Sequence, residues 1–356
     1  MDFILNGQAS GGVAQRLLAT NGDVSSLRPY IWKDGKAYVS VPSFNAQKGK
    51  FEYKRVPLQT NAATLRYEDW RLLDTAVLKA ARQRLGLVAD LRGRGQAFTI
   101  GNGLSKTVFS TETMSDPGTA KLSMDGLAKG TGDRPEFAMT NLPLPIAHAD
   151  FSFSLRQILV SRNSNTPLDT SMAEAASRRV SEVCEQLAIG SYGTFTFGGG
   201  SIYGLTNFPS RITKTLTAPT ATGWTPKTTL DQVLDMKQKS IDKLNYGPWT
   251  LYVATGWDQH LDKDYSEVKG DITLRDRILK INGITKVMTL DYLSGFQMVL
   301  LQNTTDTFRE VVGMDLTTVQ WETQGGMEIN FKVMAIMVPQ PRADHNGNCG
   351  IVHGNV

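Results

Sequence analysis

Residues 92–150 carry the most information about the architecture of this chain, and they read RGRGQAFTIGNGLSKTVFSTETMSDPGTAKLSMDGLAKGTGDRPEFAMTNLPLPIAHAD. Between Gly93 and Gly132 there are eight glycines and few large apolar side chains. Ordering such a segment costs conformational entropy that burial of its own side chains does not offset. Its charges have both signs: Lys106, Glu112, Asp116, Lys121, Asp125, Lys129, Asp133 and Arg134. The segment therefore does not form a core by itself.

The two ends of this segment alternate as strands do. Phe98 and Ile100 alternate with small or polar residues, and the same pattern recurs over residues 149–155. We therefore predict an extended two-stranded arm. A long insert without a core is either a mobile linker or a functional segment, and we favour an arm that another subunit orders.

The composition is that of an ordinary globular protein. With 356 residues, 40% hydrophobic and 20% charged, the chain can bury one large core or two smaller ones, and two domains are the first expectation. No apolar run approaches the roughly 18 residues of a membrane span, and the first residues lack the pattern of a secretory signal. The two cysteines, Cys184 and Cys349, argue against a disulfide framework. We expect an intracellular protein without a membrane partner.

The net charge of +4 is concentrated near the start of the chain. Residues 1–60 hold eight Lys or Arg against four Asp or Glu, and 8 − 4 = +4. Such an excess is found both on solvated arms and on surfaces that face a polyanion. Both interpretations stay open, and the pattern does not indicate a sequence-specific DNA reader.

The clearest helix signal lies at 171–189. Ser171 and Glu174 have the spacing of a capping box, apolar residues then recur at helical spacing, and Gly190 ends the run. Cys184 falls on the apolar stripe. We therefore predict that Cys184 is a buried core residue and not a nucleophile.

Periodicity predicts further helices and strands. Helices are expected at 64–85, with Gly86 as a C-terminal stop, at 228–244 and at 274–281. Strands are expected at 38–41, 249–255, 286–290, 296–302, 308–312, 316–322 and 328–339. The rest of 1–60 reads as an arm with little regular structure, because glycines interrupt it. Together these elements predict an α+β fold.

The sequence contains no recognisable catalytic constellation. Gly198, Gly199 and Gly200 precede Ser201, but no Gly-Lys-Ser/Thr follows, so we predict a backbone turn and not a phosphate cradle. No Gly-x-Ser-x-Gly nucleophile elbow occurs. His345, Cys349 and His353 are evenly spaced, but they are one ligand short of a zinc site and match no finger spacing. We predict no catalytic residue, no cofactor and no metal, and hence no enzyme.

The order of the segments resembles a known family. The polar arm, the 171–189 helix and the glycine turn lead into Tyr203-Gly204-Leu205-Thr206-Asn207-Phe208-Pro209 and then an α+β region. This order resembles the major capsid proteins of tailed phages with the Hong Kong 97 fold, in the encapsulin-like subgroup. Residues 70–92, 251–265 and 312–316, with Pro339, also look similar to encapsulin-type shell proteins. The resemblance covers about 65–356.

The resemblance implies an α+β Hong Kong 97-like capsid fold with an N-terminal arm, an extended E-loop hairpin, a peripheral domain and an axial domain. The implied boundaries are 1–60 for the arm, 61–91 and 151–209 for the peripheral domain with its spine helix at 169–189, 92–150 for the E-loop, 210–335 for the axial domain and 336–356 for a C-terminal return to the peripheral domain.

The implied function is structural. A major capsid protein of a bacteriophage self-assembles through pentamers and hexamers into an icosahedral shell, the virion capsid, which encloses double-stranded DNA. Its implied partners are its own copies, nonspecifically bound DNA, a portal protein, and scaffolding or decoration proteins, and assembly takes place in the host bacterial cytoplasm. The alternative is an encapsulin-type compartment that encloses a cargo enzyme. We expect no proteolytic maturation of the N terminus.

The resemblance also implies two sets of functional residues. Assembly residues of the E-loop are expected to be Phe98, Ile100, Lys106, Glu112, Lys121, Lys129, Arg134 and Phe137. Residues that face the lumen or the DNA are expected to be Arg16, Arg28, Lys48, Lys50, Lys54 and Arg55. The first set would contact a neighbouring copy, and the second would contact phosphates or brace neighbouring subunits.

Overall fold

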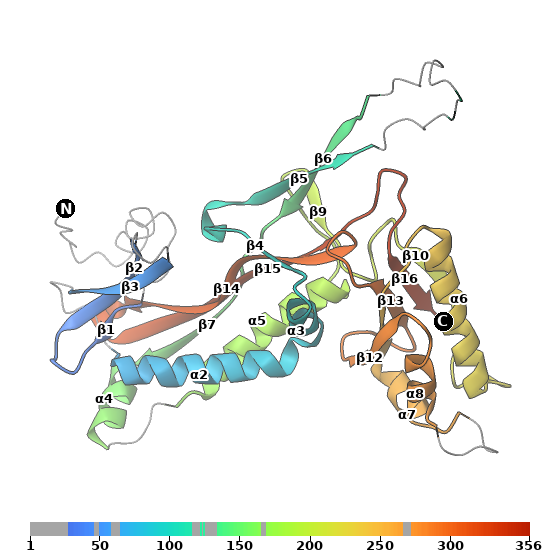
Figure 1. Cartoon of the computed structure of the whole chain (residues 1–356). Coiled ribbons are helices and arrows are strands. Elements are labelled where there is room, and N and C mark those ends of the chain that lie inside the picture. Colours follow the sequence, from blue (N-terminus) through green and yellow to red (C-terminus); the bar gives the residue numbers. More distant parts are fainter. Residues whose placement is uncertain are drawn as a thin grey trace.

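The computed structural model describes residues 28–45, 50–57, 65–115, 122, 124, 134–164, 169–265 and 272–356. Figure 1 shows two halves packed side by side and a hairpin that projects away from both. One half is built on a four-stranded sheet and the other on a five-stranded sheet. The mixture of helices and sheets confirms the predicted α+β class.

The four-stranded sheet has the order β4-β14-β15-β7, and helices cover one of its faces (Figure 1). Ile329, Phe331 and Val333 on β15 alternate with polar residues and point into a core with Trp70 and Val180 from the helices. The bounds are β4 (Ala97–Thr99), β7 (Ala147–Ser154), β14 (Phe308–Thr323) and β15 (Glu328–Pro341), with the short turn η4 (Gln324–Gly326) between the last two and the helices α2 (Tyr67–Arg84), α4 (Leu155–Asn163) and α5 (Ser171–Ile189).

Helix α5 lies where the sequence predicts it, but it begins differently. Thr170 is the N-cap residue, and the Ser171 N–H donates to the Asp169 carboxylate over 3.0 Å. The predicted capping box at Ser171 is wrong, because Ser171 is already the first helical residue and the Glu174 carboxylate accepts from the Thr170 hydroxyl instead. Gly190 ends the helix with a φ of 95°, as predicted.

Helix α2 also confirms the prediction, whereas its expected stop is wrong. The chain bends at Leu85, and Gly86 begins a new helix, α3 (Gly86–Gly93). Gly86 has no positive φ, so it does not act as a C-terminal cap. The side chains that bury α2 against the sheet and α5 include Trp70, Leu73, Val77 and Ala81.

The five-stranded sheet has the order β10-β16-β13-β11-β12. All residues of β11 (Trp249–Ala254) are buried, as expected of a central strand. Tyr252 and Trp257 are among the largest side chains in this core. The other elements are β10 (Ile212–Thr215), α6 (Pro226–Asp242), η3 (Thr255–Trp257), α7 (Asp258–Leu261), α8 (Leu274–Leu279), β12 (Ile284–Leu290), β13 (Met298–Gln302) and β16 (Ile351–Asn355).

Strand pairing connects the two halves differently from the expected boundaries. β14 and β15 pair with each other and with β4 and β7, although residues 308–335 were expected in the axial part. β16 lies between β10 and β13 in the interior of the five-stranded sheet, although 336–356 were expected to return to the peripheral part. Only 336–341, at the end of β15, pair within the four-stranded sheet. The expected boundaries were carried over from the resemblance, and periodicity could not correct them because it identifies a strand without its partners.

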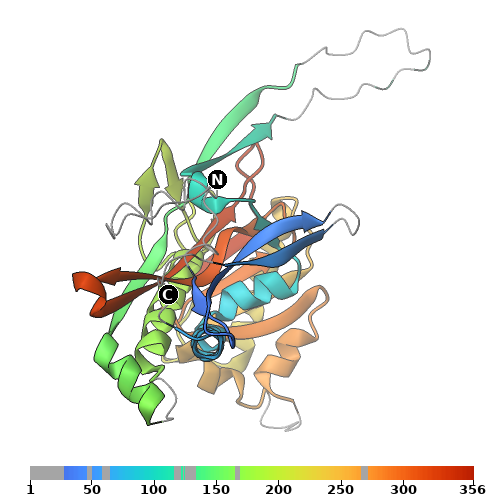
Figure 2. The same cartoon turned by 90° about the vertical axis from the view of Figure 1, so that its left-hand side faces the viewer.

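The N-terminal region is more regular than the sequence suggests. It contains a three-stranded sheet of β1 (Tyr30–Ile31), β2 (Ala37–Asn45) and β3 (Lys50–Pro57). The expectation of little regular structure is therefore wrong for this part of 1–60. Tyr30, Trp32 and Tyr67 form an aromatic cluster that fixes this sheet to the start of α2. Figure 2 shows the β2–β3 hairpin standing out from the body.

The projecting hairpin consists of β5 (Val108–Met114) and β6 (Phe137–Pro143), and we call it the limb hairpin. The sequence predicts such an arm but with the wrong strands. Residues 97–99 pair with β14, and 147–154 pair with β15, so both expected arm strands belong to the body. The short helix η2 (Gly103–Ser105) and the hairpin of β8 (Phe195–Phe197) and β9 (Gly200–Ile202) are found in the adjoining segments.

Among the described helices, none combines the length and the apolar character that crossing a membrane requires.

Candidate assembly surface

The base of the limb hairpin is fixed by its own small core. Leu142 and Leu144 are buried at the end of β6, beside Ile100. The partners that complete this cluster come from both long strands and from β9, and include Ile202, Val311, Ile336 and Val338. The limb hairpin is therefore joined to the body by packed side chains and not by a hinge of polar residues.

Two glycines allow the backbone to pack closely at this base. A Cβ on Gly103 would lie 2.3 Å from the Gly313 carbonyl oxygen, and a Cβ on Gly200 would lie 2.0 Å from the Asn141 carbonyl oxygen. Only glycine fits such contacts. Asn141 also donates from Nδ2 to the Gly198 carbonyl over 3.2 Å, which ties β6 to the β8–β9 turn. The predicted backbone turn at 198–200 is confirmed.

A polar network adds to this attachment. The Arg309 guanidinium lies 4.6 Å from the centre of the Phe98 ring and donates to Gln340 Oε1 over 2.7 Å. Gln340 in turn donates from Nε2 to the Thr111 hydroxyl over 3.2 Å. The contacts to Phe98 and Thr111 join β4 and the limb hairpin to β14 and β15, and the Arg309–Gln340 hydrogen bond links these two long strands to each other. The direction of the limb hairpin is thus set by the body.

The two faces of the limb hairpin have different chemistry. One face carries Thr111, Thr113 and Thr140 and borders a hollow of about 550 Å³, which the loop 341–345 also lines. The opposite face carries Met114, Phe137 and Met139, whose exposed fractions are 54%, 64% and 69%, together with the exposed Glu112, which pairs with Met139. Met139 also borders the hollow. Phe137 pairs with Met114 across the hairpin, so these side chains are neighbours. Figure 2 shows the hairpin extending beyond the body.

Sequence reasoning missed two members of this apolar face. Met114 and Met139 were not among the expected assembly residues, because their strands were assigned elsewhere. The signal was present, since Phe137 and Met139 alternate with Ala138 and Thr140.

The structure divides the expected assembly residues. Glu112, Arg134 and Phe137 are exposed on or beside the limb hairpin, and Lys106 is exposed near its base. Phe98 is 40% exposed on β4, where it packs against Phe109. Ile100 is buried in the core of this chain. Lys121 and Lys129 lie outside the described residues.

The expected DNA-facing residues are likewise scattered. The Arg28 guanidinium donates to both oxygens of Asp74 over 2.7 Å and lies over the Trp70 ring. Its charge is therefore already paired. The Arg55 guanidinium lies 3.7 Å from the centre of the Trp32 ring, and Lys54 is exposed on the same strand. Arg16 and Lys48 lie outside the described residues, as does the side chain of Lys50.

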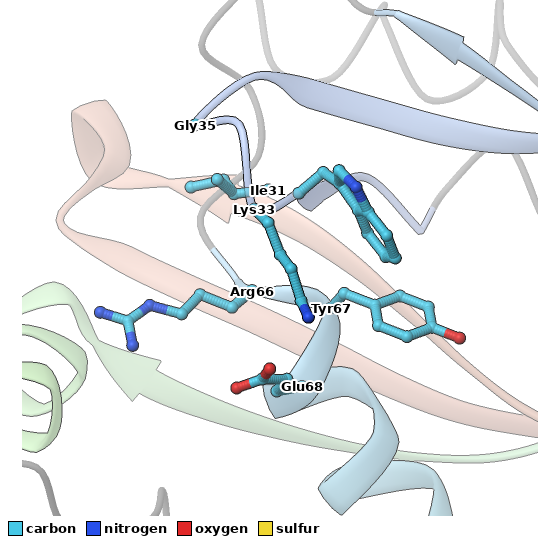
Figure 3. A pocket seen from close by; sticks show the side chains of 7 residues that line it. Ile31, Lys33, Gly35, Arg66, Tyr67 and Glu68 are labelled. Carbon is cyan, nitrogen blue, oxygen red and sulfur yellow. The ribbon is translucent and has the colours of Figure 1, made fainter.

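A smaller hollow of about 270 Å³ lies where the N-terminal sheet meets the start of α2 (Figure 3). Figure 3 shows Lys33 extending between Arg66 and Tyr67, while Arg66 points away from Tyr67. Glu68 contributes a charge of opposite sign on the first turn of α2. All three charged residues are exposed, so the hollow lacks the buried, convergent polar groups typical of a ligand site.

The described side chains that could act as metal ligands or nucleophiles do not form a site. In the described part of the chain, no three His, Cys, Asp or Glu residues gather in a metal-binding arrangement. Cys184 and Cys349 are both buried, and burial raises the pKa of each thiol to about 12. The assignment of Cys184 to the core is confirmed. Burial, with the nearby charge of Arg211, lowers the pKa of His353 to about 4, so this imidazole is neutral at physiological pH.

Several solved structures share the architecture of this chain. A virus-like particle from Pyrococcus furiosus aligns with a TM-score of 0.57 and 16% identity, covering 81% of this chain and 99% of that one. The capsid of Myoviridae phage XM1 aligns with a TM-score of 0.56 and 12% identity, covering 73% and 89%. The capsid of a native GTA particle aligns with a TM-score of 0.53 and 12% identity, covering 73% and 88%. No curated protein sequence matches.

The expected fold is confirmed by these likenesses: the chain has the Hong Kong 97 fold found in phage capsids. A family model described as "Family of unknown function (DUF6260)" matches residues 60–354, which is most of the chain. The chain therefore belongs to the DUF6260 family, and it has the Hong Kong 97 capsid fold.

Proposed function

We propose that this chain is the major capsid protein of a tailed phage. Many copies associate through pentamers and hexamers into an icosahedral shell around double-stranded DNA, and the role of each copy is structural and not catalytic. The fold shared with the capsid of phage XM1 and with the GTA particle capsid supports this proposal. The particle forms in the host bacterial cytoplasm, and a portal protein at one vertex gives the DNA a way into the closed shell.

One observation carries the proposal: Met114, Phe137 and Met139 are exposed on the limb hairpin, which projects from the body (Figure 2). Burying a Phe or Met side chain contributes about 1.5–3 kcal/mol. A neighbouring copy that covers this face would supply that contribution. Closed symmetry repeats each contact around the shell, so modest single interfaces give a stable particle.

Shortening the limb hairpin tests the proposal. Thr111 and Thr140 are directly opposite each other, so an Asn-Gly turn that joins them removes 112–139 and leaves the base intact. We expect a folded chain with unchanged circular dichroism that no longer forms particles in negative-stain microscopy. Normal particles from this variant would contradict the proposal.

A matched pair of point variants isolates the apolar face. Met139→Ser changes a residue that is 69% exposed on the limb hairpin, and Met327→Ser changes one that is 66% exposed at the turn between β14 and β15. We expect Met139→Ser to raise the protein concentration needed for assembly about tenfold, and Met327→Ser to leave it unchanged. Equal effects of the two substitutions would show that the limb hairpin has no special role.

The enclosed DNA is tested by the contents of purified particles. Exposed Lys54, with any cations of the segment before residue 28, would make nonspecific phosphate contacts whose strength falls with salt. Particles that retain nuclease-protected double-stranded DNA support this part of the proposal. Scaffolding or decoration proteins would appear in the same preparation.

A second function is favoured by one comparison. The virus-like particle from Pyrococcus furiosus is covered over 99% of its length, which keeps an encapsulin-type compartment as the alternative. In that case the shell encloses a cargo enzyme and no nucleic acid. Mass spectrometry and a nucleic-acid assay on the same particles separate the two functions.

A further inference from the structure

Two helical segments, α2–α3 and α5, run from the core of one half into the core of the other. α2 buries Trp70 and Leu73 in the core of the four-stranded half, whereas Leu87 and Leu91 of α3 lie in the core of the five-stranded half. α5 makes the same crossing, since Ala188 at its end belongs to the second core. We call this place the helix junction, meaning α3 and the last turn of α5. The angle between the two halves therefore depends on the packing of α3 against α5.

A buried carboxylate joins the two helices at the junction. Glu185 on α5 is 2% exposed, and it accepts hydrogen bonds from the N–H groups of Leu87, over 2.5 Å, and Val88, over 3.2 Å. These amides are in the first turn of α3, where N–H groups have no partner within the helix. Glu185 therefore caps α3 from another element of the chain.

The Glu185 carboxylate is almost completely shielded from water. A Cβ on Gly86 would lie 3.5 Å from Glu185 Oε1 and 3.4 Å from the Met288 methyl carbon. Leu290, also on β12, lies on the same side. The carboxylate is thus enclosed by α5, α3 and β12. Moving the halves apart would admit water to it.

The charged groups around Glu185 do not neutralise it. Glu310 on β14 and Asp291 after β12 both carry the same sign of charge. The cation on α3, Arg92, donates to Glu310 over 2.8 Å and to Asp315 over 2.9 Å. The adjacent Cys184 thiol is un-ionised. Burial raises the pKa of Glu185 to about 7, the two N–H donors oppose this rise, and the charges of Glu310 and Asp291 add to it.

A second buried group at the junction also lacks partners. Gln96 is 2% exposed, and neither its Nε2 nor its Oε1 makes a hydrogen bond among the described residues. Its backbone joins α3 to β14, because its N–H donates to the Leu91 carbonyl and its carbonyl accepts from the Glu310 N–H. Hydration of this amide would favour an open junction in the same way as hydration of the carboxylate.

We propose that the helix junction is a proton-linked hinge, in which Glu185 holds a proton while the halves are packed and loses it when water enters. The sign follows from linkage. The packed junction binds the proton more tightly than an open one, in which a hydrated carboxyl has its ordinary pKa of 4.5. Acidification from pH 7 to 5 therefore favours the packed junction, and a rise in pH favours opening, by roughly tenfold per pH unit in this window.

This inference does not rest on the proposed function, because the hinge belongs to a single chain. If the chain does form shells, the same protonation would bias the angle between the halves and with it the curvature of the shell. Light scattering at each pH, in the same samples, shows whether the assembly state stays constant. A failure of assembly is thereby distinguished from a failure of the hinge.

Hydrogen exchange of the α3 amides tests the proposal in the full chain. We expect the protection factors of 86–93, corrected for the intrinsic effect of pH, to fall by about tenfold per unit from pH 5.5 to 6.5 and to level off above pH 7. Glu185→Gln should remove this dependence. Glu174→Gln, an exposed change on the same helix, should leave it intact. Protection that is independent of pH in the unsubstituted chain, or an unchanged slope in Glu185→Gln, would overturn the proposal.

A second variant covers the case in which Glu185→Gln does not fold. Asp291 is exposed, so Asp291→Asn should fold normally while removing one charge that opposes ionisation of Glu185. The pH above which protection levels off should then move to lower pH. An unmoved transition in Asp291→Asn would count against Glu185 as the titrating group.

Discussion

At the scale of single residues, the attachment of the limb hairpin depends on the absence of side chains as much as on their presence. Gly103 and Gly313 bring two backbone segments together where a methyl group would overlap a carbonyl oxygen. Neither glycine has a positive φ, so closeness and not backbone conformation requires glycine here. The same segment contains Gly101, which has open space around it. The sequence does not distinguish Gly103 from Gly101, and only the fold shows that Gly103 has no room for a side chain.

Gly103→Ala should therefore destabilise the chain, whereas Gly101→Ala should not. The added methyl would lie 2.3 Å from the Gly313 oxygen, and overpacking of this kind costs about 1–3 kcal/mol. Denaturant unfolding measures the difference in the free energy of unfolding. Equal stability of the two variants would mean that η2 moves aside without cost.

At the scale of elements, the sequence predicts helices and buried strands well where the pattern is local. The helix at 171–189, the strand at 249–255 and the long strand from 328 follow from periodicity alone. Pairing is not local, and for that reason residues 97–99 and 149–154 were assigned to the arm although they complete the body sheet. Helix α3 has only eight residues, so its apolar pattern is too short to identify. Of the assembly surface, Phe137 was predicted, and Met114 and Met139 were not.

Capping gives a test at this scale. Ser154 begins α4 with a true capping box, in which its side chain accepts from the Gln157 N–H over 3.3 Å and the Gln157 side chain accepts from the Ser154 N–H over 2.9 Å. Ser154→Ala should cost about 1 kcal/mol in the free energy of unfolding. Ser171→Ala removes a side chain that caps nothing at α5, and thermal unfolding should show little change. A larger loss of stability for Ser171→Ala than for Ser154→Ala would show that Ser171 does cap α5.

At the scale of the whole molecule, the two halves are interlaced along the chain. The chain leaves the four-stranded half after α5, builds most of the five-stranded sheet, returns with β14 and β15, and crosses back to end in β16. Neither half is therefore a continuous segment. The resemblance gives the fold and a peripheral part made of separate segments, but it places the crossings at the wrong residues, because β14 and β15 pair with β4 and β7 while β16 pairs with β10 and β13.

Truncation after Pro341 tests the interlacing. It removes β16, which pairs with both β10 and β13 and buries Ile351 and Val352. We expect loss of the five-stranded half, seen as a large fall in near-ultraviolet circular dichroism. Deleting Val356 alone, which is 56% exposed, should leave the spectrum unchanged. A native spectrum after the longer truncation would show that β16 is dispensable.

The position of β16 also determines the order in which the two halves can be completed during translation. The ribosome makes β16 after every other strand of its sheet and after both long strands of the neighbouring sheet. The half with the four-stranded sheet has all its strands once Pro341 has emerged, whereas the other half waits for a segment ten residues further on. Since nascent segments fold as soon as their contacts are available, the limb hairpin would be displayed on a growing polypeptide whose second half is still incomplete. If the chain assembles as we propose, recruitment of a neighbour by that hairpin before release would join an unfinished subunit, so timely completion of β16 would protect the shell from defective members.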